Sequence, residues 1–363
     1  MTYKQTLYFT CSCLSLGKYP KRRKEILKLI ASGYVDWDKV VKFSSNQVVV
    51  PALYYNLKQA QLLTVLPEGL EAYFEQISNA NRQRNEALIK QVDHLVSILD
   101  KHKIKFVFLK GMAHILEGLY LDIGERMVSD IDFLVAQDHV KKVAEILKAA
   151  GYIRLYEEGL LFKSRHYARL IHKDFIGALE IHWDVLDNKH ASKLSSDLIF
   201  SNKQKTANYY VSSYAHQALH NMLNAQVNDN SYNSGLILLR QVYDCFLLSF
   251  KPEVQSTLQN YKYNYYLKNL YLKSMHKFFK TELPLYEKSL FLNFLMLRYQ
   301  FSMHKNLYKI EKLVTYYSYR IYNYPRQIVL VIINKKKRQD IITNLTTKGW
   351  LKRHLQSYKK SKE

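Results

Sequence analysis

Glycine, proline and cysteine are scarce in this sequence, and each shortage excludes a class of protein. There are 11 Gly and 6 Pro among 363 residues, too few for a collagen-like or proline-rich chain or for the many turns of an all-β fold. The cysteines, Cys11, Cys13 and Cys245, cannot build a disulfide framework or a four-thiolate zinc site. Because 48% of the residues are hydrophobic, the chain can bury a large core, and we expect a mainly helical protein.

Long apolar runs are also missing. No uninterrupted apolar stretch reaches the length of about 18 residues that a membrane-spanning helix needs, so we expect no transmembrane segment. Near the N-terminus one basic residue, Lys4, precedes a short and half-polar run from Leu7 to Leu16, which is not typical of a secretory signal. We therefore expect a cytoplasmic protein.

Positive charge is in excess, with 54 Lys and Arg against 31 Asp and Glu and a net charge of +23. The segment from Phe301 to Glu363 holds 15 basic and 3 acidic residues, whereas Lys101 to Lys189 holds 14 and 13. Such an excess indicates nucleic acid, an anionic lipid surface or a phosphorylated ligand as partner. The middle of the chain is nearly neutral and rich in acids.

The residue pattern predicts four parts. Residues 1–100 form a helical segment, 101–190 an α/β core, 191–334 a second helical region and 335–363 a basic tail. Helical spacing of apolar residues predicts a long helix from Leu70 to Lys101. The further elements expected are strands or strand-like pieces at 104–109, 130–135, 152–156, 167–172 and 178–185, and helices at 112–121 and 140–150.

Asp130 and Asp132 carry the strongest chemical signal. In a strand, residues two apart point to the same face, so both carboxylates project side by side from a run that Ile131 and Phe133 would hold in a core. Two like charges so close repel, and a divalent cation, Mg²⁺ or Mn²⁺, removes the conflict while also binding nucleotide phosphates. The alternative is a surface strand end with two solvated aspartates.

A third acid strengthens this interpretation. Glu180, His182 and Asp184 share one face of the next predicted strand. If that strand lies beside the first, Glu180 completes a three-carboxylate site able to hold two metals for an in-line phosphoryl displacement. The alternatives are that Glu180 and Asp184 face solvent on an ordinary amphipathic strand, or that His182 is the functional group.

Lys110 and Gly111 end a predicted strand just before a helix. Free backbone N–H groups at a helix start bind anions, and glycine lets a phosphate approach closely. Arg126 and Ser129, on the loop before the aspartates, are expected to contact phosphates as well. The alternative for Arg126 is a local salt bridge with Glu125 or Asp122.

The order of these motifs resembles the uncharacterised bacterial nucleotidyltransferase family, within the polymerase-β-like nucleotidyltransferase superfamily. The resemblance covers roughly residues 30 to 250. Its outer motifs are Val35-Asp-Trp37, Val50-Pro-Ala-Leu-Tyr54, Asn81-Arg-x-Arg-Asn85, His216-x3-His220 and Arg240-x2-Tyr-Asp244. The fold that it implies is α+β and mostly helical, with a small mixed-sheet core flanked by N- and C-terminal helical segments.

The resemblance also implies a chemistry, the transfer of a nucleoside monophosphate from an NTP to an acceptor hydroxyl with Mg²⁺ and release of pyrophosphate. Asp130, Asp132 and Glu180 fall at its metal-ligand positions, and Lys110 with Gly111 at its phosphate turn. The second small residue of that turn is Met112 here, a departure from the superfamily pattern for which Lys110 or Arg126 is expected to compensate.

Two downstream pairs are expected on the acceptor side of the site, together with His182. His216 and His220 lie four apart on one helix face, a spacing that binds zinc in some proteins, although the glutamate of a His-Glu-x2-His motif is absent. The alternative for this pair is that both are partly buried polar residues. Arg240 and Asp244 have the same spacing. Their alternative role is a simple ion pair with each other.

The tail and the overall function leave alternatives open. The apolar run 327–333 followed by the basic cluster 335–338 is predicted either to pack as an ordinary element with a solvated end, or to contact an anionic membrane or RNA. The acceptor is a small molecule, a protein or an RNA. The rival functions are an inactive nucleotidyltransferase fold that binds RNA or an anionic partner, and a metal-dependent phosphohydrolase.

Overall fold

A computed structural model describes residues 1–155, 165–187, 190–262, 265–282 and 284–302, with isolated positions beyond them. The contacts divide the chain into one unit of Met1–Glu157 with Lys163–His304 and another of Glu158–Phe162 with Lys305–Glu363. All elements described below belong to the first unit. The basic tail 335–363 and the apolar run 327–333 lie almost wholly outside the described residues.

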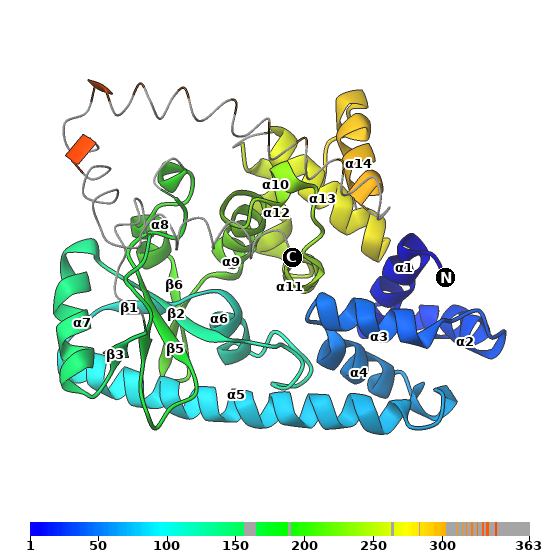
Figure 1. The fold of residues 1–363 in the computed structure, drawn as a ribbon, viewed down its shortest axis with the longest axis horizontal. Coiled ribbons are helices and arrows are strands. Elements are labelled where there is room, and N and C mark those ends of the chain that lie inside the picture. The colour runs from blue at the N-terminus through cyan, green and yellow to red at the C-terminus, as the bar shows by residue number, and fades with distance from the viewer. Residues whose placement is uncertain are drawn as a thin grey trace. The chain divides into compact units, whose positions relative to one another are not determined.

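Helices lead into the fold and end on a long helix. They are α1 (Tyr3–Leu14), α2 (Arg23–Ala31), α3 (Trp37–Asn46), α4 (Val50–Gln59) and α5 (Leu70–Lys101), with short 3-10 turns η1 (Pro20–Arg22) and η2 (Leu63–Val65). The predicted helix from Leu70 to Lys101 is confirmed. Leu88, Val92 and Leu95 are buried because their spacing places them on one face. Figure 1 shows α5 extending along both the α1–α4 group and the sheet.

A mixed sheet forms the centre, with strand order β3-β4-β5-β2-β1-β7-β6 over the described residues. Its strands are β1 (Phe106–Phe108), β2 (Asp130–Val135), β3 (Ile153–Arg154), β4 (Leu170–Ile171), β5 (Ala178–His182), β6 (Lys203–Thr206) and β7 (Tyr209–Ser212). The helices between them are α6 (Lys110–Leu116) and α7 (Val140–Ala149), with the 3-10 turn η3 (Gln137–His139). β2 pairs antiparallel with β1 and parallel with β5. The predicted strand at 130–135 and the predicted mixed sheet are confirmed.

The prediction of helix alone from residue 191 onward is wrong at one place. β6 and β7 form a hairpin, and β7 pairs parallel with β1, so the sheet continues beyond the predicted core. The turn at Ala207 has φ +47° without a glycine to mark it in the sequence. Two four-residue strands with an unmarked turn leave little signal for a pattern search.

The rest of the described chain is helical. Its elements are η4 (Ala191–Lys193), α8 (Ser196–Ser201), α9 (Tyr214–Leu223), the π-helical turn η5 (Asn224–Asn228), α10 (Ser231–Ser234), α11 (Leu239–Leu248), α12 (Pro252–Asn260), α13 (Tyr265–Phe279) and α14 (Leu290–Ser302). The fold class is α+β and mostly helical, as predicted. None of the helices in the described ranges is long and apolar enough to cross a membrane.

Two hydrophobic cores hold these elements together. One lies between the sheet, α6, α7 and the second half of α5. The other joins N-terminal and C-terminal helices: Cys11 and Cys13 of α1 are buried with Phe246 of α11 and Phe279 of α13. The rings of Phe246 and Phe279 stack with centroids 4.4 Å apart. Helices predicted as separate segments therefore share one core.

Candidate active site

Adjacent strands bring the predicted acids together. Asp132 on β2 lies directly opposite Glu180 on β5 in the parallel register, and Asp130 lies opposite Ala178. The two carboxylate side chains at this register position are 5% exposed. Ile131 and Phe133 point to the other face and are fully buried, so the hydrophobic core fixes the register. Asp132 is therefore not a solvated aspartate at a strand end, which was the alternative interpretation.

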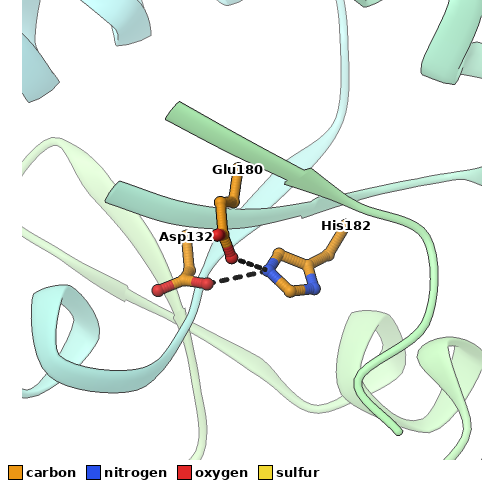
Figure 2. Close-up of side chains that lie close together, drawn as sticks. All are labelled: Asp132, Glu180 and His182. Atoms are coloured by element: carbon orange, nitrogen blue, oxygen red, sulfur yellow. Dashed lines mark hydrogen bonds and ion pairs between the residues drawn. The ribbon is translucent and has the colours of Figure 1, made fainter. Parts of the chain in front are cut away.

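His182 lies beside the two facing carboxylates and contacts both (Figure 2). Its Nε2 atom is 2.7 Å from Asp132 Oδ1 and 3.4 Å from Glu180 Oε2. The imidazole is buried. We refer to Asp130, Asp132, Glu180 and His182 as the carboxylate cluster; His182 was expected on the acceptor side, and the structure places it within this cluster instead.

Lys110 reaches the same carboxylates from the start of α6. Its Nζ atom pairs with Asp132 and lies 3.7 Å from Glu180 Oε2. The backbone of Lys110 has φ +52°, a left-handed conformation that costs a residue with a side chain about 1 kcal/mol. The nearby Asp132 and Glu180 charges outweigh the effect of burial and raise the pKa of Lys110. Backbone strain of this kind is found at functional sites, and here it occurs at the residue whose ammonium group pairs with the acids.

Arg169 is a second cation at the cluster, and sequence reasoning missed it. Its Nε atom is 2.5 Å from Glu180 Oε1, and its Nη2 atom is 3.0 Å from Asp130 Oδ2. Ser129 Oγ also donates to Asp130, at 2.8 Å. Arg169 immediately precedes β4, in a segment predicted as strand-like. The sequence offered one signal: Arg169 is a basic residue in a strand-like segment, where it could lie on the same sheet face as the acids of neighbouring strands.

The acids differ in their protonation. Burial and the neighbouring Asp132 charge raise the pKa of Asp130. Burial acts in the same direction on Glu180, but the His182 hydrogen bond, the Lys110 charge and the Arg169 hydrogen bond outweigh it and lower the pKa of Glu180. Glu180 is therefore held as a carboxylate.

The donor set fits a divalent cation. Asp132, Glu180 and His182 each offer a ligand atom, and these atoms lie within 4.8 Å of one another. Carboxylate oxygens suit Mg²⁺ and Mn²⁺, and the imidazole suits a transition metal. The ammonium group of Lys110 contacts both carboxylates. It therefore shows that a positive charge is stabilised at this position.

Gly111 and Arg126 pack against each other beside the cluster. A Cβ atom on Gly111 would lie 3.0 Å from Val128 Cγ2 and 3.5 Å from Arg126 Cζ, so a side chain there would displace its neighbours. Both residues line the same cavity as the carboxylates. Their predicted role in phosphate binding remains a prediction.

The alternative for Arg126, a local salt bridge with Glu125 or Asp122, is wrong. The guanidinium pairs with Asp244 of α11, with Nη2 2.8 Å from Oδ2 and Nε 3.0 Å from both carboxylate oxygens. Tyr120 donates to Asp244 Oδ1 at 2.8 Å, and His114 Nδ1 lies 3.8 Å from Oδ2. We call Arg126, Asp244, Tyr120 and His114 the arginine–aspartate cluster. Its connection spans more than a hundred residues of sequence, which local spacing cannot reveal.

The predicted pairing of Arg240 with Asp244 is also wrong. Arg240 donates to the backbone carbonyl of Met127 at 3.2 Å, while Asp244 is taken by Arg126. The positive charge of Arg126, together with burial, lowers the pKa of Arg240 to about 10. Arg240 therefore remains charged at neutral pH and adds to the cations around the cavity.

The two predicted histidines, His216 and His220, lie in different surroundings. His220 is buried and lines the cavity, and burial holds its pKa well below the usual range, so the ring is neutral. His216 instead contacts its own helix cap, with Nδ1 2.7 Å from Ser213 Oγ. Among the described residues, the group with metal-ligand geometry is Asp132, Glu180 and His182, not this pair.

A cavity of about 340 Å³ unites these residues. The acids Asp130, Asp132 and Glu180 share it with the cations Lys110, Arg126, Arg165, Arg169 and Arg240, and with amides from α9, η5 and α11. Cations around a metal-binding acid cluster are the arrangement that a polyphosphate needs. Arg165 and the amides were not singled out in the sequence, because isolated Arg, Asn and Gln residues carry no spacing signal.

Comparisons with known proteins give a family and a distant structure. The model of a family described as uncharacterised nucleotidyltransferases matches residues 34–260. No curated protein matches the chain. The crystal structure of JHP933 from Helicobacter pylori is similar at 15% identity, covering 66% of this chain and 98% of that one, with a TM-score of 0.29; at that score it carries no argument about this protein.

Proposed function

Since the chain belongs to the uncharacterised nucleotidyltransferase family, we propose that it transfers a nucleoside monophosphate from an NTP to an acceptor hydroxyl. The observation that carries the proposal is the facing pair of buried carboxylates, Asp132 and Glu180, in a cavity lined by cations. Two buried acids side by side are unfavourable for folding unless a cation compensates them. A triphosphate with its metal supplies the ligand that matches both the acids and the cations.

In the proposed reaction the acceptor oxygen attacks the α-phosphorus and forms a new P–O bond. The bond from that phosphorus to the bridging oxygen breaks, and pyrophosphate leaves with the electron pair. The acceptor proton passes to a carboxylate of the site. Lys110, Arg169 and Arg240 stabilise the negative charge on the phosphates, an electrostatic contribution that is largest in a buried site.

Asp130, Asp132 and Glu180 would hold a divalent metal, with His182 as a neighbouring donor. When bound, such a metal neutralises phosphate charge and orients the attacking and leaving oxygens. His182 keeps the Asp132 carboxylate oriented through its 2.7 Å contact. Lys110 and Arg169 would move from the carboxylates to phosphate oxygens, since both side chains are long and partly exposed.

Thermal unfolding tests the proposal. Wild type is compared with Asp130→Asn/Asp132→Asn and with Asp138→Asn, an exposed acid outside the cavity, in each of ATP, GTP, CTP and UTP with Mg²⁺ or Mn²⁺. A nucleotide at a hundred times its Kd adds about 2.7 kcal/mol of stability. We expect a metal-dependent shift in wild type and Asp138→Asn that the double variant loses. A shift that survives in the double variant would contradict the assignment.

A binding module is the second candidate, and one observation favours it. Lys110 and Arg169 together contact all three carboxylates, so the chain's own cations already balance much of the acid charge. Under this alternative the protein binds RNA or another anionic partner without nucleotide, and affinity falls steeply with salt. Absence of any NTP-dependent shift, with salt-sensitive RNA binding, would favour it. Release of free NMP without an adduct would instead indicate a phosphohydrolase.

A further inference from the structure

One wall of the cavity is made mainly of amides. We call Gln217, Asn221, Asn224 and Gln241 the amide wall; they come from α9, η5 and α11, and the carboxylate of Asp229, the residue after η5, lies beside them. Figure 1 shows α9 and α11 near the end of the sheet. The triphosphate chemistry proposed above uses none of these residues, so the wall is available to the second substrate.

Gln217 presents only an acceptor. Its Nε2 donates to the Ser212 carbonyl at 2.6 Å and also to the Glu117 carboxylate. Both partners are acceptors, so the orientation of the amide is fixed. Its Oε1 is buried and has no hydrogen-bond partner among the described residues, and the side chain lines the cavity while only 2% of the residue is exposed.

Gln241 repeats the arrangement. Its Nε2 donates to Asp229 Oδ2 at 2.6 Å, and Asn224 Nδ2 donates to the same oxygen at 2.9 Å. The Oε1 of Gln241 is likewise buried and has no partner among the described residues. The amide nitrogens of Gln217 and Gln241 thus donate to neighbouring acceptors of the protein, which leaves their two Oε1 atoms for a ligand.

His220 adds a third unpartnered atom beside the wall. Its ring is neutral, 3% of the residue is exposed, and Nε2 has no hydrogen-bond partner in the part of the chain that the structure describes. A buried polar atom without a partner costs free energy that a bound ligand recovers. Three such atoms, on Gln217, Gln241 and His220, lie in residues that line one cavity.

We propose that the amide wall binds a small polyhydroxylated molecule of monosaccharide or polyol type, which is the acceptor. Carbonyl oxygens complement hydroxyl donors, and several acceptors on one wall suit several hydroxyls. The inference rests on the proposed function, because one of those hydroxyls is the group that attacks the α-phosphorus, with the bond changes and proton transfer given above.

The lack of a large aromatic ring in the cavity favours this acceptor over an RNA end. Unstacked bases stack on aromatic rings or on Arg guanidinium planes. No Phe, Tyr or Trp is among the described residues that line the cavity, and its arginines lie around the acids that would hold the phosphates and metal. The lining includes the short apolar patch of Met127 and Val128. A volume of about 340 Å³ is at the small end of ligand cavities and suits a sugar-sized molecule beside phosphates.

Two measurements on the full chain test the inference. Saturation-transfer NMR detects binding of myo-inositol, glucose, galactose, ribitol and N-acetylglucosamine, each with and without NTP and Mg²⁺. A transfer assay with α-³²P-labelled NTP then compares these compounds with a short RNA and with a Ser- and Tyr-containing peptide. The variants are Gln241→Met and Gln217→Met, which remove the acceptor oxygen at similar size. Gln204→Leu, on the exposed face of β6, is the matched control.

We expect at least one polyol to bind and to accept label. Loss of one neutral hydrogen bond should raise the KM for the polyol about two- to tenfold in each Met variant, more than the KM for NTP, with Gln204→Leu at the wild-type value. Two variants in different helices guard against one that fails to fold.

The contrary outcomes separate the two proposals. Label on RNA or peptide but on no polyol overturns the acceptor class while supporting nucleotidyl transfer. Polyol binding unchanged in both Met variants, or absent altogether, also overturns it. Absence of nucleotide binding contradicts the proposed function, and the NMR result without NTP still decides whether the wall binds polyols.

Discussion

The carboxylate cluster and the arginine–aspartate cluster are two ionic groups that each contribute side chains to the cavity lining, and they differ in charge balance. In the arginine–aspartate cluster one guanidinium meets one carboxylate in a two-point contact, and Asp244 is fully buried. In the carboxylate cluster three acids share cations on long side chains that are 24% and 48% exposed, those of Lys110 and Arg169.

The difference teaches what each group is built for. The Arg126 charge outweighs burial and lowers the pKa of Asp244, while burial lowers the pKa of His114 to about 4, so one positive and one negative charge cancel. Such a closed pair ties α11 to the loop before β2. The carboxylate cluster has an excess of acid and partners that can leave, which is the condition for taking up a metal and a phosphate.

The largest expected difference between the clusters is the effect of substitutions on turnover, which only the carboxylate cluster should affect strongly. Asp132→Asn keeps the size and a hydrogen bond to His182 but removes the charge. We expect metal-dependent transfer to fall by about a thousandfold, measured with labelled NTP and the acceptor found above. The free energy of unfolding should change by about 1–3 kcal/mol, because weaker contacts to Lys110 and His182 are partly offset by the loss of repulsion from Glu180. Asp138→Asn is the control, and wild-type turnover in Asp132→Asn would remove the acids from the mechanism.

The second effect is on stability and belongs to the other cluster. Arg126→Met leaves the Asp244 carboxylate buried without its partner, which costs about 3–5 kcal/mol. Urea unfolding measures it. The double variant Arg126→Met/Asp244→Leu removes both charges, so it should recover part of the loss. If Arg126→Met were as stable as wild type, the pair would not be the tie between α11 and the sheet.

Glu125 is a buried acid outside both clusters, pairs with no cation among the described residues, and supplies a pH test. Burial raises the pKa of Glu125 to about 7; Tyr243 donates to its Oε1 at 2.5 Å and the Leu121 N–H to its Oε2 at 2.9 Å. The folded protein therefore keeps a proton that the unfolded chain loses near pH 4.5. Stability contributed by this group is complete below that pH and is lost as the pH rises toward 7.

Glu125→Gln removes this titration. Relative to wild type, the variant should become more stable by about 2–3 kcal/mol as the pH rises from 5 to 8, measured by urea unfolding at each pH. The variant also loses the hydrogen bond from the Leu121 N–H. This loss lowers its free energy of unfolding by the same amount at every pH, so only the change with pH reports the titration of Glu125. A difference that does not change with pH would show that Glu125 is already ionised in the folded protein at pH 5.

Features of the fold and the site could be predicted when the residues that form them lie close together in the sequence. The pair Asp130 and Asp132, the helix 70–101 and the α+β class follow from local periodicity, and the family match covers the same stretch. The partner of Arg126 could not be predicted, because Asp244 lies 118 residues away. The hairpin β6–β7 was missed because it has neither glycine nor proline at its turn.

Arg169 lies between the locally predictable motifs and the distant Arg126–Asp244 pair in sequence distance. Its substitution is the change for which we expect the smallest effect. Its pairs with Asp130 and Glu180 resemble the Arg126 pair in chemistry, but its side chain is 48% exposed, so water and salt screen the charge. Arg169→Met should change the free energy of unfolding by less than about 1 kcal/mol, and by still less in 0.5 M NaCl as the ionic strength shortens the ~10 Å screening length. Arg126→Met, the matched substitution, should keep its larger cost at both salt concentrations because that pair is buried. Equal costs for the two variants would mean that burial does not distinguish the clusters, and the contrast between a closed tie and an open binding site would have to be given up.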